Sequence, residues 1–120
     1  MEIEPAIGHI AEICAPLNHD VLHHPKVRIF YNDAREALLT SRQKYDLISS
    51  EPSNPYRAGV ASLFTVDFFR EAAARLAPGG LFAEWLQVYD LDAESLRLVY
   101  ATIGAAFAEV ETWETQLDTD

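Results

Sequence analysis

The stretch YDLISSEPSNP, residues 45–55, decides the fold prediction. A short apolar strand over residues 47–50 is followed by two polar side chains, Glu51 and Asn54, each with a proline directly after it. Because proline keeps the residue before it extended, both side chains should be held on a stiff loop at the carboxyl end of the strand. In open α/β sheets ligands bind at that end. The stretch predicts a ligand-binding loop, although a proline-rich turn with a solvated Glu51 fits the same spacing.

Strands and helices alternate around this stretch. Apolar residues recur at helical spacing after Pro5 and after several capping residues, which predicts helices there. Apolar runs of strand length lie between the predicted helices. Pro78-Gly79-Gly80 predicts a turn that ends the third helix. The predicted strands cover residues 1–4, 27–31, 47–50, 81–88 and 109–115. The predicted helices begin at Pro5 or after the caps Asp33 (or Asn32), Thr65 and Asp92.

This alternation predicts an α/β fold with a mostly parallel sheet and helices on both of its faces. A chain of 120 residues has room for one core, so residues 1–120 are expected to form a single domain. We further expect Asp33 and Glu51, each placed directly after a predicted strand, to face one shared crevice.

Composition and charge restrict the class of partner. With 49% hydrophobic residues the chain is expected to be globular, and its net charge of -10 disfavours nucleic acids and anionic membranes as partners. No apolar run approaches the roughly 18 residues that a membrane span needs. The N-terminus is acidic and does not resemble a signal peptide, and the single cysteine, Cys14, cannot form an internal disulfide. These features favour a cytoplasmic protein.

A set of short motifs, taken in order, resembles the spermidine synthase (polyamine aminopropyltransferase) family. The likeness is strongest to bacterial spermidine-synthase-like domains that are fused to transporter segments. The resemblance implies a Rossmann-like S-adenosylmethionine-dependent methyltransferase fold. The motifs are Glu2-Ile3-Glu4-Pro5, Asn32-Asp33-Ala34, residues 45–48 with 51–55, residues 58–65 and residues 76–80.

One part of the family pattern is missing. In the family a strand and a glycine-rich turn precede the acidic motif at Glu2, whereas the paired Gly79-Gly80 of this chain follow a predicted helix. The resemblance therefore implies a partial domain that lacks the first strand, and an incomplete gene model would explain this. Strands without that neighbour would expose unpaired edges, so a homo-oligomer is one expected outcome.

The resemblance also implies a reaction. An aminopropyl group, or a methyl group, would pass from decarboxylated S-adenosylmethionine or S-adenosylmethionine to a small-molecule amine. Glu51 stands where the family has its catalytic Asp, and Asn54 stands where it has a second, substrate-binding Asp. Glu51 is one methylene longer than the family residue, and Asn54 cannot offer an ammonium a negative charge. Putrescine is therefore in doubt as the acceptor.

Three further residues match the family's donor site. Glu2 would accept hydrogen bonds from the ribose hydroxyls, Asp33 would accept one from the adenine amine, and Ala34 would leave space for the base. A frayed Glu2 and a purely capping Asp33 fit the sequence as well. Trp85 lies where many family members have a glutamine that faces the substrate, and we expect it to be a core residue instead.

The histidines of residues 19–24 lie in a polar connection with no nearby Cys or Glu to complete a ligand set, so no metal is expected.

Two other functions remain open: a non-catalytic remnant that folds as an oligomer or with a partner, and a nucleoside-binding module. Whether the isolated chain is an enzyme is uncertain, and we expect little or no turnover of putrescine by it.

Overall fold

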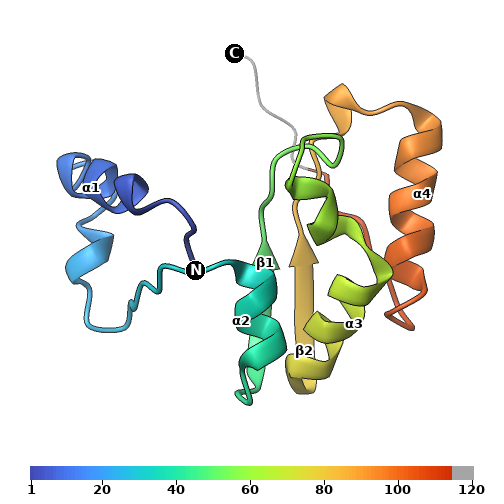
Figure 1. Ribbon diagram of the computed structural model, residues 1–120, viewed down its shortest axis with the longest axis horizontal. Helices are drawn as coiled ribbons and strands as arrows, with labels where there is room; N and C mark the ends of the chain where they lie inside the picture. Colours follow the sequence, from blue (N-terminus) through green and yellow to red (C-terminus); the bar gives the residue numbers. More distant parts are fainter. Residues whose placement is uncertain (115–120) are drawn as a thin grey trace. The chain divides into compact units, whose positions relative to one another are not determined.

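The computed structural model describes residues 1–114, which form two units. The first unit is Met1–Arg42, and the second begins at Gln43. The α/β class and the parallel pairing predicted from the sequence are both confirmed. In chain order the elements are α1 (Pro5–Ile13), the 3₁₀ helix η1 (Val21–His23), α2 (Ala34–Thr40), β1 (Tyr45–Ser50), η2 (Val60–Phe64), α3 (Val66–Arg75), β2 (Leu76–Glu84), η3 (Val88–Asp90) and α4 (Ala93–Gly104) (Figure 1).

In the first unit α1 and α2 begin where local chemistry predicts. Pro5 occupies the first turn of α1, where a missing N–H costs nothing, and the Glu4 carboxylate accepts a hydrogen bond from the Ala6 N–H. Asp33 caps α2 by accepting from the backbone N–H groups of Arg35 and Glu36. The Tyr31 ring lies against Gly8 of α1, at a place where any larger residue would collide with it.

The predicted strands at residues 1–4 and 27–31 are not formed as strands. Only one parallel bridge joins Glu2 to Tyr31, with Glu2 N donating to Phe30 O and Asn32 N donating to Glu2 O, both at 3.0 Å. Residues 27–30 are neither helix nor strand, because the described part of the chain gives them no further ladder partner.

The second unit is built on β1 and β2, which run parallel and are connected through η2 and α3 (Figure 1). Ile48 pairs with Phe82, and Ser50 pairs with Glu84, so the two strands end side by side. The prediction of a strand over residues 81–88 is corrected here, since β2 begins at Leu76 and ends at Glu84.

The glycines predicted to form a turn lie inside β2. α3 ends at Arg75 and the strand begins with the next residue, so Pro78-Gly79-Gly80 does not end the helix. Gly79 has φ +77°, a conformation that glycine adopts without strain. A Cβ on Gly80 would lie 2.9 Å from the Tyr45 carbonyl oxygen. The strand therefore passes close to β1 only because residue 80 has no side chain.

The core of the second unit lies between the sheet, α3 and α4. Phe69 of α3 is fully buried, and its ring meets the Phe82 ring of β2 edge to face at a centroid distance of 5.7 Å. The Phe107 ring stacks on Phe82 at 5.3 Å. Phe68, Phe64, Ala72 and Val99 complete the buried apolar set.

Within the described part of the second unit, no helix packs on the opposite side of the pair, where the register partners Leu47 and Leu81 are 60% and 68% exposed. Helices on both faces of the sheet stay a prediction.

α4 is capped by Asp92, as predicted, but the strand predicted for residues 109–115 is absent from 109–114. That segment has no ladder partner among the described residues. Its Thr112 hydroxyl instead forms a 2.7 Å hydrogen bond with the Tyr100 hydroxyl of α4. Residue 115 lies outside the described residues.

Candidate functional site at the carboxyl ends of the strands

The loops that follow β1 and β2 leave the sheet together. Trp85 N donates to Ser50 O at 2.9 Å, which joins the last residue of β1 to the first residue after β2. Polar side chains that come after either strand are thus gathered at one edge, where α/β sheets bind ligands.

Glu51 is the first residue after β1 and is exposed. The Ser49 hydroxyl donates to its Oε1 at 3.3 Å, and this is its one hydrogen bond among the described residues. Its carboxylate is therefore accessible and has acceptor capacity to spare, which a general base for a bound ligand requires.

Asn54 lies in the same loop but is 4% exposed. Its amide nitrogen donates to the Tyr56 hydroxyl at 2.8 Å and to Asp90 Oδ2 at 3.0 Å, so it ties the loop after β1 to the loop after β2. Its Oδ1 is buried without a partner among the described residues. We call Asn54, Tyr56 and Asp90 the polar rim.

Asp90 was not among the site residues predicted from the sequence. It lies 36 residues after Asn54, and only the parallel pairing of β1 with β2 brings the two loops together. The exposed Asp90 carboxylate places a negative charge beside the neutral Asn54 amide.

Glu84, the last residue of β2, was also missed. Both of its carboxyl oxygens are buried, and neither accepts a hydrogen bond from the described residues. This burial raises the pKa of Glu84 from 4.5 to about 8, and the Ser50 hydroxyl acts in the opposite direction as the smaller cause. The carboxyl group is therefore mostly protonated at neutral pH.

An apolar hollow of about 510 Å³ adjoins the polar rim. It is formed by the loop after β1, η2, the start of α3, Leu91 and one side of α4 from Ser95 to Thr102. Tyr56 belongs both to the rim and to the wall of the hollow, and Leu91, the neighbour of Asp90, also lines it.

The predicted donor residues lie in the first unit. The bridge between Glu2 and Tyr31 sets two parallel segments side by side, and Glu2 O accepts from Asn32 N, the residue before Asp33. The structure therefore brings Glu2 and the Asp33-Ala34 motif together. One oxygen of each carboxylate binds local backbone N–H groups, at 2.9 Å from Glu4 N for Glu2 and at 2.8 Å from Arg35 N for Asp33. Whether Glu51 and Asp33 face one crevice stays a prediction.

Trp85 is 47% exposed, so the prediction that it is a core residue is wrong. β2 ends one residue earlier, and Trp85 enters the loop with its backbone, rather than its ring, joined to β1.

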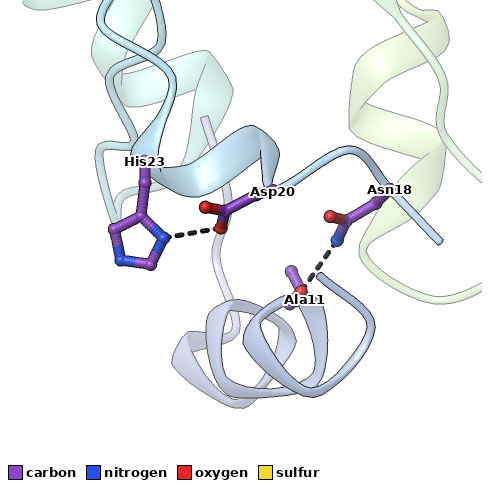
Figure 2. A network of polar contacts seen from close by, with 4 residues as sticks. All are labelled: Ala11, Asn18, Asp20 and His23. Carbon is purple, nitrogen blue, oxygen red and sulfur yellow. Dashed lines mark hydrogen bonds and ion pairs between the residues drawn. The ribbon is translucent and has the colours of Figure 1, made fainter. Parts of the chain in front are cut away.

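The histidine region forms a polar network without metal-ligand geometry (Figure 2). His23 Nδ1 lies 2.6 Å from Asp20 Oδ1, and the hydrogen bond and charge of Asp20 raise the pKa of His23 above 6.5. Asn18 Nδ2 donates to Ala11 O at 2.7 Å, which ties the turn back to α1. Residues 1–114 contain no group of three His, Cys, Asp or Glu side chains that could hold a metal ion.

Within the same described range, no helix combines the length and the apolar character that crossing a membrane requires.

The sequence of the chain is similar to those of several polyamine aminopropyltransferases. The chain is 31% identical over 83 residues to polyamine aminopropyltransferase 1 of Streptomyces coelicolor, a match that covers 67% of this chain and 16% of that protein. It is 24% identical over 121 residues to the polyamine aminopropyltransferase of Clostridium beijerinckii and 27% identical over 119 residues to that of Leptospira biflexa. The chain is a relative of the polyamine aminopropyltransferases.

The alignments with the Clostridium and Leptospira aminopropyltransferases cover nearly all of this chain but less than half of each relative. The Clostridium and Leptospira alignments cover 99% and 98% of the chain, so they extend over both units, including the motifs predicted to bind the donor. The chain spans 42% of the length of each of these two relatives. No family model and no solved structure matches the chain.

Proposed function

We propose that the chain is a spermidine-synthase-like transferase domain, which moves an aminopropyl group from decarboxylated S-adenosylmethionine to an amine. The observation that carries this proposal is the exposed Glu51 carboxylate at the carboxyl edge of a parallel strand pair, in a chain related to polyamine aminopropyltransferases. A Rossmann-like methyltransferase fold is part of the proposal, and the β1–α3–β2 unit is compatible with it.

The residues of the first unit fit the donor chemically. Glu2 and Asp33 each use one carboxylate oxygen for a local backbone bond, and the other oxygen has no partner among the described residues. Carboxylate oxygens accept hydrogen bonds from ribose hydroxyls and from an adenine amine. Ala34, the first residue of α2, adds no bulk beside them. We assign these three residues to donor binding.

Glu51 acts on the acceptor amine. An ammonium has no lone pair, so the Glu51 carboxylate must first take one proton from it. The donor, when bound, supplies a methylene made electrophilic by its sulfonium. The freed lone pair then forms the new C–N bond while the C–S bond breaks and its electron pair returns to sulfur. Asn54, at the position of a family carboxylate, orients the loop through its bonds to Tyr56 and Asp90.

A second candidate, a nucleoside-binding module without transfer, is favoured by one observation. Within the first unit alone, Glu2 bridges to Tyr31 and accepts from Asn32 N, the residue before Asp33, independently of Glu51. Calorimetry with methylthioadenosine tests donor binding, and detection of a transfer product separates the two functions. Both predict binding that weakens in Asp33→Ala, but only the transferase predicts a product.

The transfer itself is tested by incubating the chain with decarboxylated S-adenosylmethionine and a panel of amines, and by detecting aminopropylated amine with mass spectrometry. We expect slow product formation that Glu51→Gln removes. Product formed equally by Glu51→Gln would assign the reaction to another group, and no product with any amine would reject the transferase.

A further inference from the structure

The apolar hollow beside the polar rim has the size and lining of a small-molecule site. Its volume of about 510 Å³ lies within the range of roughly 300–1,000 Å³ that is typical of ligand pockets. Its walls include Phe64 from η2 and Leu98 and Val99 from α4. Such a wall favours a hydrocarbon group, because it removes apolar surface from water on both sides.

Hydroxyl groups on the wall do not make the hollow polar. Thr65 accepts from Phe68 N as the cap of α3 and donates to Ser62 O, and Thr102 donates to Leu98 O of its own helix. Both hydroxyl protons are thus committed, and none of the lining residues carries a charge, so the hollow offers a second ammonium no carboxylate.

The polar rim stands at one end of this hollow. Tyr56 lines the hollow, its hydroxyl accepts from the Asn54 amide, and that amide also donates to the exposed Asp90 carboxylate. Leu91, the residue after Asp90, also lines the hollow, so the exposed carboxylate belongs to a segment that continues into the wall. An exposed carboxylate joined through Asn54 and Tyr56 to the wall of an apolar hollow matches a ligand with one ammonium and one apolar body.

We propose that the hollow holds the apolar substituent of a monoamine acceptor, whose ammonium group rests on Asp90. The inference rests on the proposed function, since it names the class of amine that the transferase accepts. It makes Asp90, rather than residue 54, the source of the negative charge that holds the acceptor.

A diamine fits this arrangement poorly. The rim offers one carboxylate, because Asn54 is neutral and its amide nitrogen is already committed to Asp90 and Tyr56. A second ammonium would enter mostly apolar walls that carry no carboxylate, and burying a charge without an opposite charge is strongly unfavourable. An alkyl or aryl group in the same place is favoured instead.

Binding of four probes to the purified chain, without donor, tests the inference directly. The probes are hexylamine, propylamine, putrescine and hexanol, and the dissociation constants come from calorimetry or NMR titration. Hexylamine should bind tightest, by about fourfold over propylamine for each additional methylene that is buried. Hexanol should bind at least about tenfold more weakly than hexylamine, because it cannot pair with a carboxylate.

Three variants locate the binding. Leu98→Ala removes an exposed part of the wall, and Ala61→Phe fills the hollow. Each should reduce the preference for hexylamine over propylamine. If one of the two variants fails to fold, the other still tests the site. Asp90→Asn should reduce the preference of hexylamine over hexanol by about tenfold or more. Glu109→Gln, an exposed carboxylate outside the rim, is the matched control and should leave every constant unchanged.

The results separate this inference from the proposed function. Putrescine binding as tightly as hexylamine, hexanol binding as tightly as hexylamine, or constants unmoved by both Leu98→Ala and Asp90→Asn would each overturn it, even if aminopropyl transfer is observed. Hexylamine binding that depends on Leu98 and Asp90 upholds the site, and absence of transfer would then count against the reaction alone.

Discussion

A carboxyl group buried away from water holds its proton more tightly than one in water, and Glu84 is such a group. Its pKa of about 8 in the folded chain exceeds the ordinary 4.5 of the unfolded chain. Below about pH 4.5 both states are protonated, and the stability associated with this group is fully present. Between 4.5 and 8 only the unfolded state ionises, so that stability is lost as pH rises.

We predict that the free energy of unfolding falls by at most about 1.4 kcal/mol per pH unit between pH 5.5 and 8 because of Glu84. Urea titrations of the wild type and of Glu84→Gln at several pH values measure this. Glu84→Gln should flatten the dependence, and Asp46→Asn, an exposed carboxylate on β1, should not. Equal slopes in the wild type and Glu84→Gln would contradict the burial argument.

His23 is a second residue whose protonation the structure sets. The Asp20 carboxylate, 2.6 Å away, stabilises the imidazolium, so the pKa of His23 should lie above 6.5. NMR titration of the imidazole protons should show this shift, and Asp20→Asn should lower the pKa. Glu12→Gln is the control, because the charge of Glu12 contributes least among the causes. An unchanged pKa in Asp20→Asn would mean that the contact is absent in solution.

At the scale of elements, β2 depends on the absence of a side chain at residue 80. A Cβ there would lie 2.9 Å from Tyr45 O, 3.0 Å from Ala77 O and 3.1 Å from Asp46 O, all of them backbone atoms. Gly80→Ala should destabilise the second unit by about 1–3 kcal/mol through this overcrowding. Denaturant unfolding measures the effect.

Gly104→Ala is the matched control for that substitution. A Cβ at the last residue of α4 meets open space, and alanine favours a helix by about 0.5–1 kcal/mol over glycine. A Gly80→Ala variant as stable as Gly104→Ala would show that β2 does not approach β1 as described.

Local chemistry explains which elements the sequence could predict. The starts of α1, α2, α3 and α4 were predicted from Pro5 and from the caps Asp33, Thr65 and Asp92, because a cap acts on the three residues after it. Strands are different, since each needs a partner from elsewhere. Residues 27–31 and 109–114 have strand-like patterns but no ladder, and two glycines continue β2 instead of ending a helix.

The same distinction holds for the site. Glu51 could be predicted from its position after an apolar strand, because strand and loop are adjacent in sequence. Asp90 and Glu84 could not, since their surroundings depend on contacts with the loop and strand end around residues 50–54. Only the parallel pairing of β1 with β2 reveals that the Asn54 amide donates a hydrogen bond to the Asp90 carboxylate.

At the scale of the whole molecule, the open face of the strand pair has a consequence for assembly. Leu47 and Leu81 lie side by side and are mostly exposed, and such apolar pairs favour association. We predict concentration-dependent self-association in sedimentation equilibrium, which Leu81→Lys should weaken and Leu17→Lys, an exposed residue of the first unit, should not. A monomer at all concentrations would contradict this prediction.

The transferase proposal depends on one proton transfer by Glu51, and the rate of aminopropyl transfer in three variants measures it most directly. With decarboxylated S-adenosylmethionine and a saturating amine, Glu51→Gln should lower the rate by about 100-fold or more. Glu51→Asp should keep or raise it, because Asp is the residue of the resembled family, and Ser53→Ala in the same loop should leave it unchanged. A rate that Glu51→Gln leaves intact would contradict the account.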